Sequence, residues 1–179
     1  MICRKVSKSI GILCKLSSIL PVKSLKCLYF SLIQPYLSYC NLIWGNTFAT
    51  HLNPLIILQK RAIRLVCKKS YYFHTDSLFK NSKILKLVDI NKLNLACFMY
   101  KNHLDPIFTR NHPYGTRNQN SSLPAFQRLT MTQQSIYYSG PLLWNTIPPE
   151  IKHSSSLDSF KRKYKNHLLN LYESNRTDE

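Results

Sequence analysis

The sequence predicts a mainly α-helical protein, in which a helical bundle is followed by a helical C-terminal region. Apolar residues recur at three- and four-residue steps through most of the chain, which is the spacing of one face of an α-helix. Prolines and short polar residues stand where several of these stretches begin, as they do at helix N-termini. With 44% apolar and 12% aromatic residues in 179, the chain can bury a core, as one domain or as two small units that share it.

The first segment, residues 1–20, is expected to form an amphipathic helix with a basic outer face. Arg4, Lys8 and Lys15 fall near the side of the helical wheel opposite the apolar residues. Gly11 projects onto this basic side, where its missing side chain either lets a phosphate backbone approach closely or merely weakens the helix by about 1 kcal/mol. The apolar side is formed by Ile2, Val6, Ile10, Leu13, Leu16 and Leu20.

Two apolar stretches follow. Pro21 suits the first turn of a helix over about residues 22–33. Pro35 begins a second stretch, which covers residues 36–44. The residues expected to be buried in the first stretch are Leu25, Leu28, Tyr29 and Leu32.

The next predicted helix has the densest basic surface in the chain. Asn53 is expected to be its N-cap and Pro54 its first helical residue, and the helix should reach about Lys69. Its apolar seam consists of Leu55, Leu58, Ala62, Leu65 and Val66. The basic side consists of Lys60, Arg61, Arg64 and Lys68.

No Lys, Arg, Asp or Glu occurs from Cys27 to Gln59. Gln34-Pro35, Asn41, Gly45-Asn46 and Asn53-Pro54 break this stretch into pieces that are too short to cross a bilayer. We therefore expect a buried helical pair rather than a membrane span, and no membrane partner.

Residues 70–106 are expected to be a helical extension packed on a bundle formed by residues 1–69. After an aromatic loop over residues 71–74, Thr75 or Asp76 can cap a short helix that contains Leu78 and Phe79. A longer helix over about residues 89–103 has apolar side chains on both sides, so it belongs in the interior. These side chains are Ile90, Leu93, Cys97 and Tyr100 on one side, and Leu95, Phe98 and Met99 on the other.

The rest of the chain divides into two segments. Residues 107–132 lose the helical period and form a loop-rich segment, which could hold a short β-hairpin around Leu123–Thr130. Residues 133–179 combine an aromatic cluster with a terminal amphipathic helix over about residues 156–172, where Ser155 and Asp158 have the spacing of a capping box. The cluster holds Tyr137, Tyr138 and Trp144, and the seam of the helix holds Leu157, Phe160, Tyr164, Leu168 and Leu171.

The charge of the chain points to a polyanionic partner. Twenty-five Lys and Arg face eight Asp and Glu, a formal net charge of +17. Residues 1–75 carry eleven basic side chains and no acidic one. Such self-repulsion is tolerated most easily beside a polyanion, so nucleic acid is the leading partner. An anionic membrane surface and a merely solvated basic face are the weaker alternatives.

The six cysteines are expected to be reduced core thiols of an intracellular protein. No two are closer than eleven residues, so no zinc-type pair exists, and most have apolar neighbours at helical spacing. The N-terminus resembles a signal peptide, but Lys15 interrupts its apolar centre and no small-residue cleavage site follows. We expect a nuclear or cytoplasmic protein that is not secreted.

No constellation in the sequence predicts catalysis. The acidic residues are scattered singly, the four glycines form no phosphate loop, and the six histidines show no metal-ligand spacing. No catalytic residue, metal or cofactor is therefore expected in this chain. What remains is basic helix faces beside aromatic side chains, of which Tyr71, Tyr72, Tyr114 and Tyr137 could stack on bases or could instead be core or rim residues.

Several short sequence motifs, which occur in the same order along the chain, resemble those of a known family. They include KVSKSIGILCKL over residues 5–16, YFSLIQPYLSY over 29–39, LQKRAIR over 58–64, YGTRN over 114–118 and GPLLWN over 140–145. Over nearly its whole length the chain resembles the C-terminal portion of reverse transcriptases from non-LTR, jockey-like (LINE-type) retrotransposons. Residues from about 4 to 69 look like the thumb helices that hold a primer–template duplex, and the remainder looks like the helical region after the thumb.

The resemblance implies a nucleic-acid-binding part of an RNA-directed DNA polymerase, which grips an RNA–DNA hybrid or RNA duplex through its phosphates. The palm's paired aspartates have no counterpart in the sequence, so the chain is not expected to polymerise alone, and only the parent polymerase would use Mg. The palm of the parent enzyme is then a second partner. The expected phosphate contacts are Arg4, Lys8, Lys15, Lys60, Arg61, Arg64 and Lys68.

Two other functions remain open. The uncharged stretch from Cys27 to Gln59 could make the chain a helical protein-interaction piece, which exposes an apolar patch when it is alone. Met1 lies just upstream of the thumb-like segment, which fits a truncated, non-functional copy of an element or a fragment of a longer gene product.

Overall fold

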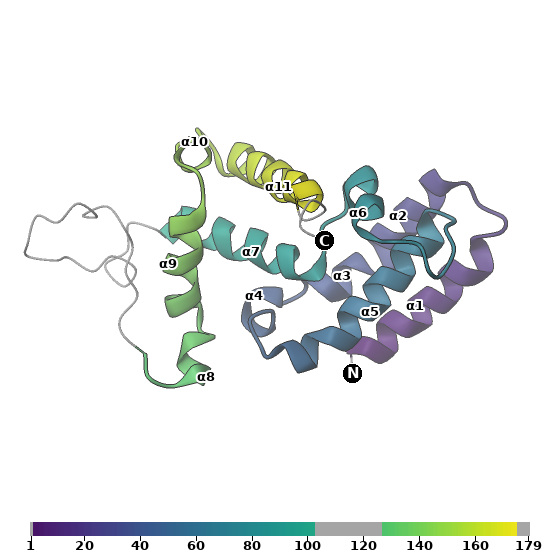
Figure 1. Ribbon diagram of the computed structural model, residues 1–179, viewed down its shortest axis with the longest axis horizontal. Coiled ribbons are helices and arrows are strands. Elements are labelled where there is room, and N and C mark those ends of the chain that lie inside the picture. Colours follow the sequence, from purple (N-terminus) through teal and green to yellow (C-terminus); the bar gives the residue numbers. More distant parts are fainter. Residues whose placement is uncertain (1, 103–126, 175–179) are drawn as a thin grey trace, which may run out of the picture. The chain divides into compact units, whose positions relative to one another are not determined.

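The computed structural model describes residues 2–102 and 127–174, and over these residues it is helical throughout, which confirms the mainly α fold class (Figure 1). No strand occurs in this part of the chain. Its helices are α1 (Ile2–Leu16), α2 (Val22–Leu32), α3 (Gln34–Ser38), α4 (Asn41–Trp44), α5 (Ala49–Val66), α6 (Asp76–Ser82), α7 (Leu87–Asn102), α8 (Thr130–Gln133), α9 (Ile136–Thr146), α10 (Pro149–Lys152) and α11 (Leu157–Ser174).

The chain divides into two compact units. Of the described residues, unit 1 comprises 2–41, 47–90 and 166–174, and unit 2 comprises 42–46, 91–102 and 127–165. Helices α4, α7 and α11 contribute residues to both units. The division therefore groups segments that are distant in the sequence, instead of following the chain in order.

Unit 1 is built on α1, α2 and α5. Helix α1 packs against α2, α3 and α5, and α2 packs against α5. Helices α1 and α5 lie side by side and run in the same direction. Helix α2, which follows α1 in the chain, runs in the opposite direction (Figure 1). Each helix buries only part of the apolar face that its sequence period predicts. The predicted residues that are half-buried instead include Leu28 and Leu32 of α2 and Leu58 and Leu65 of α5. The side chains without any exposed area include Val6, Leu13, Leu25, Tyr29, Ile33, Leu37, Ala62, Ile63 and Val66.

Helix α5 begins at Ala49, five residues before its predicted start at Pro54. Its N-cap is Phe48, and Pro54 lies inside the helix. The early start places Leu52 on the buried face, one turn before Leu55. Pro54 lies in the second turn, where its missing N–H removes the helical hydrogen bond to residue 50. Asn53 therefore lies inside the helix, and the prediction that it is the N-cap is wrong.

The apolar stretch identified over residues 36–44 contains the end of α3 and the whole of α4, both of them short helices. Helix α3 ends at Ser38, and Cys40 has a φ of 50°, in the left-handed region, before α4 begins. A left-handed residue ends right-handed helical winding, which is why the apolar run does not continue as one helix. Helix α2 begins at Val22, as predicted, with Pro21 as its N-cap rather than within its first turn.

The cysteines are free thiols, but none of them is buried. Cys14, Cys27 and Cys40 are exposed, and Cys3, Cys67 and Cys97 are half-buried. On α1, Ile10 and Leu13 fill the core beside the exposed Cys14. The prediction of core thiols was wrong because apolar neighbours at helical spacing do not say which of them faces inward.

Unit 2 has an aromatic core. Phe160 stacks on Tyr100 with ring centroids 4.6 Å apart and lies 5.9 Å from both Trp144 and Tyr164. The Tyr100 hydroxyl donates to the carbonyl of Ser154 over 2.5 Å, which closes the cluster on its polar side. Of the three aromatic residues predicted to cluster, only Trp144 is buried; Tyr137 is 59% exposed.

Helix α9 crosses α7 at a glycine. A Cβ atom added at Gly140 would lie 2.7 Å from Sδ of Met99, which is itself completely buried. The missing side chain of Gly140 therefore leaves room for the Met99 thioether, which would have to shift if a larger residue stood there.

The terminal helix differs from its prediction at both ends. Its N-terminus is capped by Ser156, whose Oγ accepts the N–H of Ser159 over 3.2 Å, and not by Ser155. Near its C-terminus Leu171 is 46% exposed, whereas Leu169 and Tyr172 are buried. The buried face turns along the helix because its last turns belong to unit 1, where the hydroxyl of Tyr172 reaches residues 86–89.

Two further predictions concern the loop-rich segment. The structure describes only residues 127–132 of it, where residues 127–129 form no strand and Thr130 begins α8, so the described end of the predicted hairpin is wrong. Residues 123–126 lie outside the described residues.

No helix among the described residues has both the length and the apolar character that a membrane crossing requires.

Candidate nucleic-acid interface

Helix α1 presents a basic face to solvent. Arg4, Lys8 and Lys15 are all exposed, on the side opposite the buried Val6 and Ile10. Nothing lies within 4 Å of a Cβ atom added at Gly11, which is also exposed. The three cations have no acidic partner among the described residues, so their charge is available to an external anion.

Helix α5 carries the second basic group. Lys60 and Arg61 are exposed near its middle, on turns whose inner side is filled by Gln59, Ala62 and Ile63. Neither cation pairs with an acid within the described part of the chain. Because α1 and α5 are neighbours, unit 1 carries basic groups on the outer sides of two adjacent helices.

Arg64 differs from its neighbours because the protein itself holds it. Its Nε donates to the carbonyl oxygen of Phe73 over 2.9 Å, and its guanidinium lies 5.6 Å from the ring centroid of Tyr71. Both contacts fix the loop that follows α5. Within the described part of the chain the other guanidinium nitrogens make no hydrogen bond, so they can still bind an anion.

Lys68 lies beyond the helix to which the sequence assigned it. Helix α5 ends at Val66, and Lys68 follows it with a φ of 52°. The N–H of Lys69 donates to Arg64 and the N–H of Lys68 donates to Leu65, which is the hydrogen-bond pattern of a Schellman motif. Lys68 therefore occupies a position that usually holds glycine, and its exposed side chain extends from the end of α5.

Two of the tyrosines predicted to stack lie in the loop after α5. Tyr71 is 67% exposed and Tyr72 is 90% exposed, and their rings meet edge to face with centroids 5.4 Å apart. Neither is a core residue, so each offers an open ring face. Tyr114 lies outside the described residues, and Tyr137 is exposed on α9 in unit 2.

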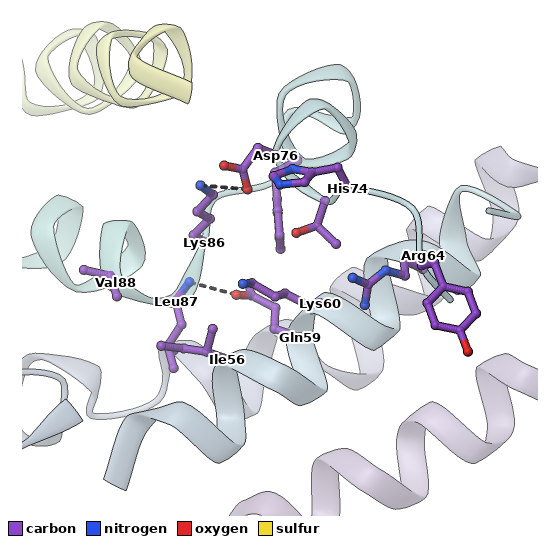
Figure 2. Close-up of a pocket in the computed structure, with 12 residues that line it drawn as sticks. Ile56, Gln59, Lys60, Arg64, His74, Asp76, Lys86, Leu87 and Val88 are labelled. Carbon is purple, nitrogen blue, oxygen red and sulfur yellow. Dashed lines mark hydrogen bonds and ion pairs between the residues drawn. The ribbon is translucent and has the colours of Figure 1, made fainter. Parts of the chain in front are cut away.

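The structure brings two of the predicted cations together at a cavity. Lys60 and Arg64 rise from α5 on one side of it, and Asp76 and Lys86 lie across from them (Figure 2). No α1 residue lines this cavity. The seven predicted contacts therefore form separate groups: an outer face of α1, an outer position on α5 at Arg61, the cavity, and Lys68 at the end of α5.

A buried amide positions the far wall of the cavity. The Gln59 side chain donates to the carbonyl of Leu85 over 2.9 Å and accepts the N–H of Leu87 over 2.8 Å, so it holds the backbone on both sides of Lys86 (Figure 2). It also donates to the hydroxyl of Tyr29 over 3.0 Å. Burial raises the pKa of Tyr29 to about 12.

The side chain and the backbone of Lys86 are both fixed. Its Nζ lies 3.0 Å from the carboxylate of Asp76 and 4.4 Å from the ring centroid of Tyr172. Its N–H donates to the Tyr172 hydroxyl, which donates in turn to Asp89 over 2.6 Å. Burial and the charge of Asp89 raise the pKa of Tyr172 above its ordinary value.

Comparisons with known proteins add no assignment. No protein-family model, curated protein or solved structure matches this chain. The described residues hold no group of three or more His, Cys, Asp or Glu that could bind a metal ion.

Sequence reasoning missed Gln59, His74, Asp76 and Lys86 as residues of one site. One of them had a signal, because Gln59 stands one helical turn after Leu55 and one before Ala62, within the apolar seam. A polar residue at such a position is buried and must find hydrogen-bond partners. Lys86 carried no such signal, since its place beside Asp76 depends on how residues 83–88 fold back on α5.

Proposed function

We propose that this chain binds a nucleic-acid duplex through its phosphates, as the thumb and following helical region of a non-LTR, jockey-like reverse transcriptase. One observation carries the proposal. The first 75 residues contain eleven basic side chains and no acidic one, and Arg4, Lys8, Lys15, Lys60 and Arg61 are exposed on two neighbouring helices. Cations without acidic partners favour a polyanion, because phosphates neutralise their mutual repulsion.

The proposed binding is independent of base sequence. Each phosphate that a Lys or Arg neutralises releases condensed counterions, which lowers the logarithm of the binding constant by about 0.9 per unit of log salt. Four or five contacts would give a slope of about −4. The preferred duplex is an RNA–DNA hybrid or an RNA duplex. Polymerisation would need the Mg-dependent palm of the parent enzyme, so this chain is not proposed to be active alone.

Fluorescence anisotropy with a labelled RNA–DNA hybrid tests the proposal. The full chain is titrated at several salt concentrations, and the series is repeated with duplex DNA. We expect a slope near −4 for the hybrid. Lys8→Ala and Arg61→Ala should each weaken binding to all sequences alike and reduce the magnitude of the slope by about one.

Lys163→Ala is the matched control, because Lys163 is exposed on α11 and its loss changes the net charge equally. It should leave the slope unchanged. A folded, monodisperse chain that binds no hybrid or duplex at low salt would contradict the proposal. So would equal effects of Lys163→Ala and Arg61→Ala, since binding would then follow net charge alone.

A second candidate function is that of a helical protein-interaction piece. The uncharged stretch contributes several exposed apolar side chains to unit 1, so the expectation that it is simply buried fails in part. These are Phe30, Tyr36, Tyr39, Phe48 and Ile57, of which Tyr39 is 77% exposed and Ile57 is 63% exposed. Size-exclusion chromatography with light scattering separates the two functions. A concentration-dependent dimer or larger assembly favours the interaction piece, and a monomer favours the self-contained nucleic-acid binder.

A further inference from the structure

The cavity beside α5 has the dimensions of a small-molecule site. Its volume is about 340 Å³, at the lower end of the roughly 300–1,000 Å³ that is typical of ligand pockets. Its walls are α5, the loop from Tyr72 to Thr75, α6 and the segment from Lys86 to Val88. It lies wholly within unit 1. It can hold a group of nucleotide size but not a folded partner.

The charges that line the cavity favour an anion. Lys60, Arg64 and Lys86 face a single carboxylate, that of Asp76, which leaves two net positive charges when His74 is neutral. The carboxylate already pairs with Lys86 at 3.0 Å. Lys60 has no partner among the described residues, and Arg64 uses only its Nε inside the protein. Two cations on adjacent turns of α5 thus remain able to bind an entering anion.

The cavity is also organised in advance. Gln59 holds Leu85 and Leu87, Tyr172 holds the backbone of Lys86, and Arg64 holds the loop at Phe73. A site whose donors are fixed before binding loses less conformational entropy when the ligand enters.

The exposed ring of Tyr72 lies at the same cavity, where it can stack on a base. An anionic group with an adjoining aromatic ring therefore matches both features of the lining. Two net positive charges complement a phosphate monoester, which carries about two negative charges at neutral pH, better than a phosphodiester, which carries one.

We propose that this cavity binds the phosphate monoester of a nucleotide, with Lys60 and Arg64 contacting the phosphate and Tyr72 stacking on the base. The monoester is either the 5′-terminal phosphate of a nucleic-acid strand or a free nucleoside monophosphate. For a strand end the inference rests on the proposed function, to which it adds an end-recognition site distinct from the basic outer face of α1. For a free nucleotide it stands independently.

The test compares two labelled single-stranded oligonucleotides of the same sequence, one with a 5′-phosphate and one with a 5′-hydroxyl. Anisotropy of the full chain should show about tenfold tighter binding of the phosphorylated strand, since charge-assisted contacts to Lys60 and Arg64 are added. Calorimetry with AMP, and with adenosine as the uncharged comparison, tests the free nucleotide. Binding of AMP that displaces the phosphorylated strand would show that one site takes both sources.

Adjacent cations on α5 supply the matched variants. Lys60→Ala removes a cation that lines the cavity, and Arg61→Ala removes an exposed neighbour that does not. We expect Lys60→Ala to abolish the preference for the 5′-phosphate and the binding of AMP, while Arg61→Ala keeps both. Thermal melts of both variants verify that they are folded, as expected for exposed helical positions.

Three outcomes separate this inference from the proposed function. Equal binding of both oligonucleotides with no binding of AMP overturns the phosphate site and leaves duplex binding intact. A 5′-phosphate preference that survives Lys60→Ala also overturns the phosphate site, because the terminal phosphate then binds to another part of the protein. Binding of AMP that depends on Lys60, without binding of any strand or duplex, supports the phosphate site and contradicts the proposed function.

Discussion

The side-chain oxygen of Gln59 accepts the backbone N–H of Leu87 over 2.8 Å and thereby ties α5 to a segment 28 residues further along the chain. The same amide donates to Leu85 and to Tyr29, and it is 1% exposed. One buried polar group thus fixes both a core helix and the wall of the candidate phosphate site.

Replacing Gln59 by Leu should destabilise the protein by about 3 kcal/mol. The change would leave the Leu87 N–H, the Leu85 carbonyl and the Tyr29 hydroxyl without this partner in the interior, at about 1–3 kcal/mol for each group left unsatisfied. Urea unfolding followed by circular dichroism measures the loss. Asn53→Leu is the control, because Asn53 is an exposed amide on the same helix. Equal stabilities of the two variants would contradict the role given to Gln59.

The two buried tyrosines predict a loss of stability at alkaline pH. Folding raises the pKa of Tyr29 to about 12, whereas a tyrosine in an unfolded chain has a pKa near 10. The stabilisation that comes from this pKa difference is complete below pH 10. It is lost as the pH rises from 10 towards 12, because in that range the tyrosine loses its proton in the unfolded chain but keeps it in the folded protein. Tyr172 has its pKa raised in the same direction, so its share is also lost above pH 10.

Urea midpoints of the wild type and of Tyr29→Phe between pH 8 and pH 12 measure this effect. The difference between the two proteins removes the contribution of the lysines, which titrate in the same range. The ratio of the folding equilibrium constant of the wild type to that of Tyr29→Phe should be constant below pH 10. Between pH 10 and pH 12 this ratio should fall about tenfold per pH unit. A difference independent of pH up to 12 would show that Tyr29 titrates normally.

Lys68→Gly should stabilise the protein by about 1 kcal/mol. Lys68 has a φ of 52°, a conformation that costs a residue with a Cβ about 1–2 kcal/mol and glycine much less. Lys60→Gly removes the same charge from the middle of α5 and should destabilise by about 1 kcal/mol. Thermal melts of the pair should therefore shift in opposite directions, and a shift in the same direction would contradict the Schellman assignment.

Gly11→Ala separates the two hypotheses for the basic face of α1. An added Cβ meets no atom within 4 Å, so the variant should be about 1 kcal/mol more stable through helix propensity alone. If a phosphate backbone passes close to Gly11, the same variant binds the RNA–DNA hybrid more weakly despite its greater stability. Unchanged affinity would leave Gly11 with no part in binding. Ser7→Ala, an exposed change on the same helix, is the comparison.

Gly140→Ala tests the close approach of α9 to α7. The new methyl would lie 2.7 Å from Sδ of Met99, which is completely buried, so the Met99 side chain would have to shift within the core. Overpacking of this kind costs about 1–3 kcal/mol. A guanidinium unfolding curve gives the value, and a variant as stable as the wild type would mean that Met99 can repack.

The helices of this chain were predictable because their signals are local. The apolar period, together with prolines and caps, predicted α1, α2, α7 and α11, and it placed Val6, Ile10 and Leu13 on the buried face of α1. The predictions failed where a longer-range contact decided the outcome. Helix α5 starts five residues early and buries Leu52, and near the end of α11 Tyr172, bound to Asp89, is buried in place of Leu171.

The candidate site shows the same limit. That Lys60 and Arg61 are exposed followed from their place on the helical wheel of α5. That Lys60 shares a cavity with Lys86, while Arg61 does not, depends on a backbone segment held by Gln59. No sequence pattern encodes which of two adjacent cations borders a cavity, because the opposite wall comes from a distant part of the chain.

By itself the sequence determined that the chain is mainly helical, that it carries a large net positive charge and that no acidic residue precedes Asp76. Composition and the helical period are properties of the residues themselves. Only the tertiary structure decided which cations meet, which tyrosines stay exposed and where a cavity forms. Those outcomes depend on packing and hydrogen bonds between residues far apart in sequence, such as Gln59 with Leu87 and Tyr172 with Asp89.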